Sequence, residues 1–354
     1  MNISIVNARG FIRKKLVELY QENPIATSFL SSFFKLSTST SLTVSIEVER
    51  AKESVAVDVV RGTEGNRNSF DTFSEKQYKP PYYREYFDAT DLSFYDRLFG
   101  QSAGEVDART LAEWTQEISR RYRTLQNMIL RRKELQAAQV LQTGIVELVN
   151  GDNIDFKRKG ASIVDLGGGS YWSDSIDPLT SIQTGCDFSR QEGKAQGGLF
   201  NMILGSAAIS ALLNNDDFIK KANLRRVDLM SINTPQTVSD GKLHGEITVG
   251  SYIVRIWSYP EFYTHPSTGV STAYVDPKKM ILVPENPIFT MAHAGVPVTM
   301  KNDSGDMFMR PMAGEFVFGD YIDQRLEKHI YDVKSAFVAI PTAVDTVYTA
   351  KVLP

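Results

Sequence analysis

The longest uninterrupted helical pattern in the chain covers residues 107–143, and it limits every fold that the chain can adopt. The stretch contains neither proline nor glycine, and apolar residues recur in it at spacings of three and four. These residues are Leu111, Trp114, Ile118, Tyr122, Leu125 and Ile129. At about 1.5 Å per residue such a helix is roughly 54 Å long, several times the usual length. The pattern predicts a stiff rod with one apolar stripe, which must lie along another apolar surface.

The ends and the opposite face of this helix are also informative. Asp107 predicts the N-cap, and Gly144 predicts the C-terminal stop. The polar face carries a set of cations: Arg120, Arg121, Arg123, Arg131, Arg132 and Lys133. Three roles stay open for this face: a solvated surface with helical ion pairs, contact with an acidic patch of a neighbouring subunit, or weak contact with nucleic acid. The apolar stripe breaks near residues 131–133, which argues against a sustained coiled-coil seam.

Composition excludes several classes of protein. A chain of 354 residues is long enough for about two domains, and its net charge of -3 argues against a dedicated nucleic-acid binder. The single cysteine, Cys186, excludes an intrachain disulfide and a cysteine-based zinc site. No apolar run approaches the roughly 20 residues of a membrane span, and the N-terminal residues lack the apolar core of a signal peptide. The sequence therefore predicts a soluble protein that is not secreted and does not contact a membrane.

The segments before the long helix are extended in character. Residues 11–22 predict a short amphipathic helix, residues 28–34 form an apolar patch, and residues 42–60 alternate as strands do. Residues 61–87 are polar but rich in aromatics, and Pro80 with Pro81 disfavours regular structure there. The aromatics are Phe70, Phe73, Tyr78, Tyr82, Tyr83, Tyr86 and Phe87. We expect an arm that packs outside its own subunit, because a disordered insertion would carry fewer aromatics.

The segments after the helix predict a more compact region. Residues 144–159 predict a hairpin around Asn150-Gly151, and Asp177-Pro178 predicts a helix start. Further elements are expected as a strand over 199–204, helices within 207–224, strands over 245–250, 252–259, 271–276 and 279–287, and one or two strands over 336–353. This order of elements indicates an α+β fold, since strands and helices do not alternate as βαβ units do.

One segment resembles a cofactor-binding motif. An apolar stretch from Ser162 leads into Asp165 and three successive glycines, as in the first motif of S-adenosylmethionine methyltransferases. The context differs, because Tyr171, Trp172 and Pro178 intervene before a helix can begin. No second strand with a terminal acidic residue follows at the required distance. A structural turn is favoured, and a methyltransferase is the weaker alternative.

The remaining chemistry-bearing residues do not form a recognisable site. The histidines, His244, His265, His293 and His329, lack the spacing of metal ligands. We therefore expect no catalytic residue, no metal and no cofactor, with Cys186 as a buried inert thiol. A group of methionines, Met300, Met307, Met309 and Met312, is consistent either with a plastic contact surface or with core filling.

With these features in place, the chain resembles tailed-phage major capsid proteins of the phage lambda major head protein type, which have the Hong Kong 97 capsid fold. The resemblance covers nearly the whole length, and the most specific part is the passage from long helix to hairpin over residues 132–156. Other matching segments are 29–50, 61–87, 172–182, 201–221, 274–284 and 335–352. Residues 300–325 have no counterpart in the resemblance.

The resemblance implies a division of the chain into an N-terminal arm (1–41), an extended loop (42–88), a peripheral domain (89–176) with a spine helix over 107–143, an axial domain (177–335) and C-terminal strands that return to the core (336–354). It also implies that the protein is not an enzyme but self-assembles into hexamers and pentamers of an icosahedral head around double-stranded DNA. The implied partners are a scaffolding protein, a portal and a decoration protein. Assembly would take place in the host cytoplasm, as a procapsid that later expands, and the product would be the virion capsid. Another self-assembling virion protein, such as a tail-tube or decoration protein, is the alternative.

The arm and loop provide the expected inter-subunit contacts. The candidate contact residues are Phe29, Phe33, Phe34, Phe70, Phe73, Tyr78, Tyr82 and Tyr83. Deleting residues 62–80 is expected to leave a subunit that folds but does not form stable shells.

Overall fold

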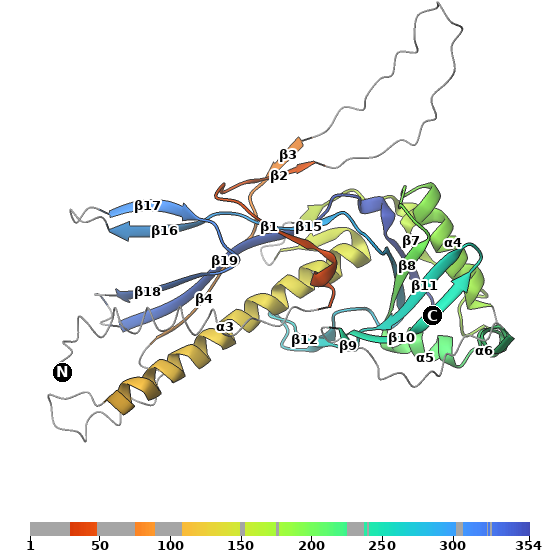
Figure 1. The fold of residues 1–354 in the computed structure, drawn as a ribbon, viewed down its shortest axis with the longest axis horizontal. Coiled ribbons are helices and arrows are strands. Elements are labelled where there is room, and N and C mark those ends of the chain that lie inside the picture. The colour runs from red at the N-terminus through yellow and green to blue at the C-terminus, as the bar shows by residue number, and fades with distance from the viewer. Residues whose placement is uncertain are drawn as a thin grey trace, which may run out of the picture.

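A computed structural model describes residues 29–47, 75–88, 108–148, 153–174, 177–224, 237–238, 241–301, 307–323, 325 and 328–354. In this part of the chain one long helix, α3 (Ala108–Thr143), runs beside a five-stranded sheet, and a seven-stranded sheet lies beyond its C-terminal end (Figure 1). Three shorter helices pack on the far side of the second sheet.

Helix α3 forms as its sequence pattern predicts. Ile118, Tyr122, Leu125 and Ile129 are buried, which confirms the apolar stripe. The helix ends at Thr143, and Gly144 follows with a φ of 71°, a conformation that glycine adopts without strain. Asp107 and the side chains of Leu111 and Trp114 lie outside the described residues.

The five-stranded sheet is built around the long strand β19 (Lys328–Pro341). Strand β4 (Tyr82–Asp88) and β18 (Val317–Asp323) both pair antiparallel with its first half, and β15 (Phe289–His293) pairs antiparallel with its second half. Strand β1 (Lys35–Thr38) adds to β15 in parallel. The sheet packs one face on α3, where rings such as Tyr331 contact Tyr122 at 6.0 Å between centroids.

The seven-stranded sheet has strands from distant parts of the chain in the order β7 (Ile163–Asp165), β20 (Tyr348–Lys351), β14 (Lys279–Pro284), β8 (Leu199–Leu204), β11 (Tyr252–Ser258), β10 (Gly241–Val249) and β9 (Thr237–Val238). One face packs on helices α4 (Pro178–Gln191), α5 (Ser206–Leu213) and α6 (Asp216–Leu224). Residues of the other face, such as Ile203 and Ile281, belong to the core that includes α3. The central strands β14 and β8 are therefore buried on both faces, whereas Glu246 and Thr248 of β10 are exposed on the face toward α3.

Four two-stranded hairpins complete the described strands. They are β2 (Val44–Glu47) with β3 (Glu75–Tyr78), β5 (Ile145–Glu147) with β6 (Asn153–Asp155), β12 (Phe262–Thr264) with β13 (Ser271–Ala273), and β16 (Val296–Lys301) with β17 (Met307–Met312). The described 3-10 turns are η1 (Ser31–Phe33), η3 (Gly160–Ser162) and η4 (Val344–Thr346). The β2–β3 and β16–β17 hairpins project from the body of the subunit (Figure 1).

Most locally predicted elements are confirmed. The fold is α+β, the hairpin after α3 forms, and α4 begins where expected, with the Asp177 carboxylate accepting the N–H of Leu179 at 3.2 Å. The strand over 199–204 is β8, and the region 207–224 holds α5 and the described part of α6. Of the strand pattern over 42–60, residues 42–47 are described, and only Val44–Glu47 of these form a strand. The predicted helix over 11–22 and the turn at Asn150-Gly151 lie outside the described residues.

The division of the chain into arm, loop, peripheral and axial domains stays a prediction, and each sheet takes strands from more than one of these segments. Residues 289–341 supply β15 to β19, which lie on the α3 side of the molecule, although the expected axial domain extended to residue 335. Strand β7 lies in the seven-stranded sheet, although residues 89–176 were expected in the peripheral domain. Regular strands flank Pro80 and Pro81, and residues 300–325 contribute to the β16–β17 hairpin and β18. Because these strands pair with partners far away in the sequence, no local sequence pattern predicts the sheet to which each strand belongs.

Candidate functional site

The described aromatics at the start of the chain pack into the subunit that carries them. The Phe29 ring lies 5.1 Å from Trp257 and 5.6 Å from Tyr259, and the Phe34 ring lies 5.2 Å from Phe289. Both phenylalanines are buried, and Phe33 is half-buried. These side chains close the subunit's own core.

Strand β4 places its aromatics alternately on two faces. The Tyr83 ring packs on Phe337 at 4.9 Å, and its hydroxyl accepts a hydrogen bond from the Gln136 amide at 2.8 Å. Phe87 stacks on Tyr331 at 5.2 Å and is buried. The odd-numbered aromatics of β4 therefore face α3, inside the subunit.

This placement differs from the expected role of the contact residues. Phe29, Phe34 and Tyr83 were expected to reach a neighbouring subunit, but their rings are used internally. Tyr83 faces inward because β4 pairs with β19 of the same chain, so one face of β4 meets the subunit's own helix. Phe29 and Phe34 lie inside because the segment that carries them packs on Trp257, Tyr259 and Phe289 of the same chain. Tyr82 is exposed, as expected for a contact residue. Phe70, Phe73 and the side chain of Tyr78 lie outside the described residues.

The face of the five-stranded sheet that points away from α3 carries exposed aromatic side chains on β4 and β18. We call Tyr82, Tyr86 and Tyr321 the outer face; all three are exposed, Tyr86 at 61%. The Arg84 guanidinium lies over the Tyr321 ring, 5.4 Å from its centroid. This cation–π contact links β4 to β18 across β19.

Beneath the outer face a buried carboxylate ties β4 to β19. Asp332 is fully buried, and its Oδ2 accepts hydrogen bonds from Arg84 Nε at 2.7 Å and pairs with Arg84 Nη2 at 2.6 Å. Lys334 Nζ lies 3.2 Å from the same oxygen. Because a buried charge is costly without partners, removing either cation leaves the carboxylate poorly compensated.

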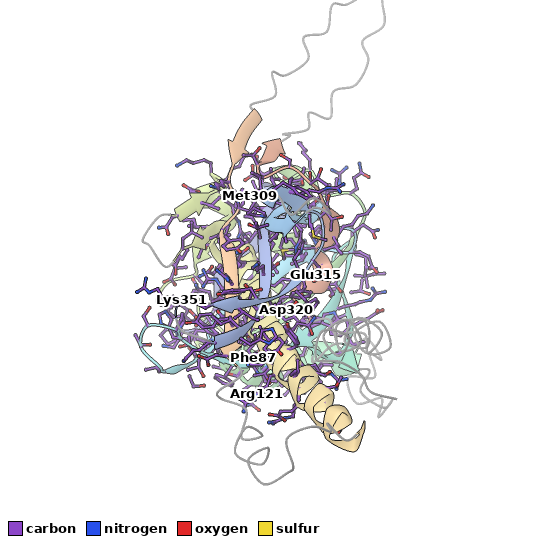
Figure 2. All side chains as sticks on the ribbon, turned by 90° about the vertical axis from the view of Figure 1, so that its left-hand side faces the viewer. Phe87, Arg121, Met309, Glu315, Asp320 and Lys351 are labelled. Atoms are coloured by element: carbon purple, nitrogen blue, oxygen red, sulfur yellow. The ribbon has the colours of Figure 1, made fainter. Side chains whose placement is uncertain are left out.

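The β17 strand carries a second exposed apolar group. Phe308, Met309 and Met312 are exposed, with Met309 at 71%. Figure 2 looks at this end of the molecule, with Met309 above Asp320 and Arg121 of α3 below. For these two methionines the structure favours the contact-surface interpretation over core filling.

The cationic face of α3 is largely occupied by contacts within the subunit. Arg120 and Arg121 pair with Glu117 at 2.6 and 3.0 Å, and the hydrogen bond from Arg120 is the main cause that lowers the Glu117 pKa to about 2. Lys133 pairs with Glu315 at 2.6 Å. Arg132 donates to the carbonyl of residue 147 at 2.6 Å.

The other two cations of this face, Arg123 and Arg131, are exposed, and neither forms an ion pair with another described residue. Over residues 115–143, the part of the helix whose side chains are described, the unpaired cations are isolated and form no continuous basic patch. A basic patch is the usual footprint of a nucleic-acid binder.

Sequence patterns did not reveal the buried ionisable groups at the C-terminal half of α3. Glu134 is 1% exposed and accepts two backbone N–H groups of the N-terminal segment. Arg158 is packed against the end of α3, donating to the carbonyls of Leu141 at 2.9 Å and Val347 at 2.7 Å, and burial lowers its pKa to about 9. Glu134 has no local signal, because charged residues are common on helix surfaces, and the partners of Arg158 at Leu141 and Val347 are distant in the sequence.

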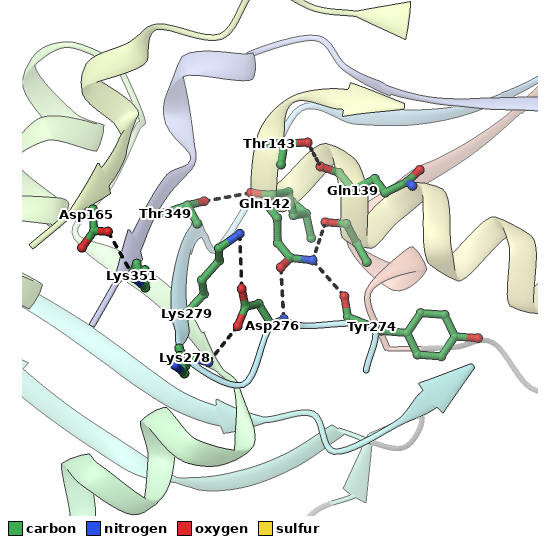
Figure 3. Close-up of polar contacts among 12 residues, drawn as sticks. Gln139, Gln142, Thr143, Asp165, Tyr274, Asp276, Lys278, Lys279, Thr349 and Lys351 are labelled. Atoms are coloured by element: carbon green, nitrogen blue, oxygen red, sulfur yellow. Dashed lines mark hydrogen bonds and ion pairs between the residues drawn. The ribbon is translucent and has the colours of Figure 1, made fainter. Parts of the chain in front are cut away.

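The segment with three glycines is a turn. Gly167 and Gly169 have positive φ angles, and α4 begins only at Pro178. Asp165 accepts a hydrogen bond from the Tyr171 hydroxyl at 2.8 Å and pairs with Lys351 at 3.3 Å (Figure 3). The Tyr171 contact closes the loop, and the Lys351 contact ties it to β20, as expected for a structural turn.

In the part of the chain that the structure describes, no cluster of three or more potential metal ligands occurs. Cys186 is buried, and burial raises its pKa to about 12, which fits an inert thiol. His244 contacts the Ser258 hydroxyl at 2.7 Å, and His329 contacts the Tyr331 hydroxyl at 3.2 Å. Among the helices with described positions, none is both long and apolar enough to cross a bilayer.

Comparison with known proteins identifies relatives of this chain. The family described as phage major capsid protein E matches residues 18–330. The crystal structure of a putative prophage capsid protein from Escherichia coli CFT073 is similar, with 18% identity, coverage of 96% of this chain and 98% of the other, and a TM-score of 0.64. A phage-related protein from Bordetella bronchiseptica RB50 has 13% identity, coverage of 96% of both chains and a TM-score of 0.54. No curated protein sequence matches the chain significantly. At these identities the two structures establish the fold, which is the expected capsid fold.

Proposed function

The chain belongs to the phage major capsid protein E family, and we propose that its copies form the hexamers and pentamers of an icosahedral head that encloses double-stranded DNA. As a major capsid protein it is a structural component of the virion and not an enzyme. The match covers most of the chain, so the capsid function applies to the fold as a whole.

The observation that carries the proposed assembly is the set of surfaces that the subunit does not cover itself. The β2–β3 hairpin projects beyond the body, and the outer face and β17 expose large apolar side chains. A soluble protein that remained monomeric would rarely expose so many such groups close together. Neighbouring subunits in a shell would cover them.

The two sheets belong to two parts of the subunit that would occupy different positions in the shell. We assign α3 and the five-stranded sheet to the peripheral domain, and the seven-stranded sheet with α4 to α6 to the axial domain. Leu213 and Ile219 are exposed where α5 and α6 reach the end of the molecule farthest from β16–β17 (Figure 1). Apolar side chains at this tip suit contacts around a capsomer axis.

The further partners are part of the same proposal. A scaffolding protein, a portal and a decoration protein would bind the assembled shell, and packaged DNA would be contacted without sequence preference. The exposed Arg123 and Arg131 of α3 are the cations available for such contact. With only isolated cations on this face, we expect the DNA contacts to be weak.

The role of the extended loop can be tested without disturbing the subunit. The backbone pairing of Glu47 with Glu75 closes the described part of the β2–β3 hairpin, so residues 48–74 can be replaced by Asn-Gly, a turn that joins two paired strands. This design keeps β3, all of which a deletion of residues 62–80 would remove.

We expect the variant to fold with the circular dichroism spectrum and melting temperature of the unmodified subunit. Expressed with its scaffold, it should give capsomers or aggregates instead of closed shells in negative-stain micrographs. Shells of normal yield and stability from this variant would contradict the assignment of the loop as an inter-subunit element.

A further inference from the structure

Helix α3 is joined to the seven-stranded sheet at its C-terminal end by direct hydrogen bonds. The Gln142 amide donates to the carbonyl of Tyr274 at 2.8 Å and accepts from the N–H of Asp276 at 3.1 Å (Figure 3). The Thr349 hydroxyl donates to the carbonyl of Leu141 at 3.0 Å. These bonds connect the end of the helix to β20 of the sheet and to the segment that leads into β14, and we call this contact the joint.

A second junction lies eight residues earlier on the helix, about 12 Å away along its axis. There the two oxygens of Glu134 accept the N–H groups of Leu30 at 2.7 Å and Ser31 at 3.0 Å. The Tyr259 hydroxyl, at the end of β11, also hydrogen-bonds to this carboxylate. One buried side chain therefore connects α3, the N-terminal segment and the second sheet.

Phe29 completes this junction from the side of the N-terminal segment. Its ring packs on Trp257 and Tyr259 of the second sheet, at 5.1 and 5.6 Å. It also lies directly over Gly241 of β10, where a Cβ atom would overlap the ring. The lack of a side chain at Gly241 makes room for Phe29 between α3 and the sheet.

We propose that residues 29–31 act as a wedge that fixes the angle between the seven-stranded sheet and α3, with Glu134 as the positioning residue. Since β1 follows the wedge after Phe34 and is held mainly by its pairing with β15, displacement of the N-terminal segment would be transmitted to the wedge. A shift of the N-terminal segment would therefore change the orientation of the two sheets relative to each other.

The chemistry of Glu134 makes this coupling strong. A carboxylate offers two acceptor atoms to two neighbouring N–H groups, and the Tyr259 hydroxyl supplies a third donor. If the wedge leaves, the buried carboxylate retains only the bond from Tyr259, and an under-compensated buried charge is unfavourable. The helix and the sheet must then separate far enough to admit water.

The test uses unassembled subunits, so it does not depend on the proposed shell. Glu134→Gln keeps the size of the side chain but turns an NH₂ group toward one of the N–H donors. The matched control is Glu117→Gln, the same change at a half-exposed position on the same helix. Hydrogen–deuterium exchange is measured for residues 30–38, for residues 241–259 and for the joint at 140–143.

In Glu134→Gln we expect hydrogen–deuterium exchange to accelerate roughly tenfold or more in both 30–38 and 241–259. Exchange at the joint should stay as in the unmodified subunit. The control variant should leave exchange in all three segments unchanged. Acceleration confined to residues 30–38, or no change in either segment, would overturn the proposal. Tyr259→Phe, which removes one donor and no volume, gives a second test should Glu134→Gln fail to fold. It should produce the same paired acceleration to a smaller extent, and its absence there would equally overturn the coupling.

Discussion

His293 predicts a specific sensitivity of the subunit to acid. The residue ends β15, is 1% exposed, and neither ring nitrogen has a hydrogen-bond partner among the described residues. Its ring packs on Phe337 at 5.4 Å. Burial, followed by the positive charge of Lys133, lowers its pKa from 6.5 to about 4, with Glu315 acting in the opposite direction.

The sign and the size of the effect follow from these two pKa values. The unfolded chain takes up a proton near pH 6.5, but folded His293 does so only near pH 4. The stability contributed by the neutral histidine is therefore complete above pH 6.5 and is lost as the pH falls toward 4. The loss from this one group is about 2 kcal/mol at pH 5 and about 3 kcal/mol in full.

The assay is urea denaturation of unassembled subunits at several pH values between 7.5 and 4. His293→Leu removes the titrating group from an apolar site. Between pH 7.5 and pH 5 the free energy of unfolding of this variant should therefore fall by about 2 kcal/mol less than that of the unmodified protein. The unmodified protein, measured at the same pH values, is the reference. Equal slopes for the two proteins would contradict this prediction, because a buried neutral histidine must contribute to the pH dependence.

Three further predictions test the packing around the sheets. Arg84→Ala should lower the free energy of unfolding by about 2 kcal/mol in urea denaturation, since the buried Asp332 carboxylate then loses one of its two cations. Arg123→Ala, at an exposed position, should change it by less than about 0.5 kcal/mol. Equal effects of the two substitutions would contradict the role of the buried pair. Gly144→Ala should cost about 1 kcal/mol in the same assay, because alanine is strained at the positive φ that ends α3, and an unchanged midpoint would argue against that geometry. Cys186 should react with a thiol reagent only in denaturant, and rapid labelling of the native subunit would contradict its burial.

The elements that the sequence predicts well are those with local causes. The stripe of α3 is fixed by side-chain spacing, and the start of α4 is fixed by the Asp177 cap with a following proline. The ion pair of Glu117 with Arg121 is likewise four residues apart on one helix. Such features need no knowledge of the rest of the chain.

The elements that the sequence did not predict depend on pairing across long distances in the chain. β4 pairs with β19 some 240 residues later, and this pairing decides that Tyr83 faces inward and Tyr82 outward. The same holds for Lys133, whose partner Glu315 lies on a distant segment. Aromatic content alone indicates that a segment is covered, but it does not distinguish the subunit's own core from a neighbour.

Cryo-electron microscopy of the protein expressed with its scaffold tests most directly whether this chain builds a closed shell. We expect closed icosahedral particles in which hexamers and pentamers place the seven-stranded sheet nearest the capsomer axes, with each β2–β3 hairpin lying against a neighbouring subunit. Tubes, isolated rings or a strictly monomeric species under all conditions would contradict it.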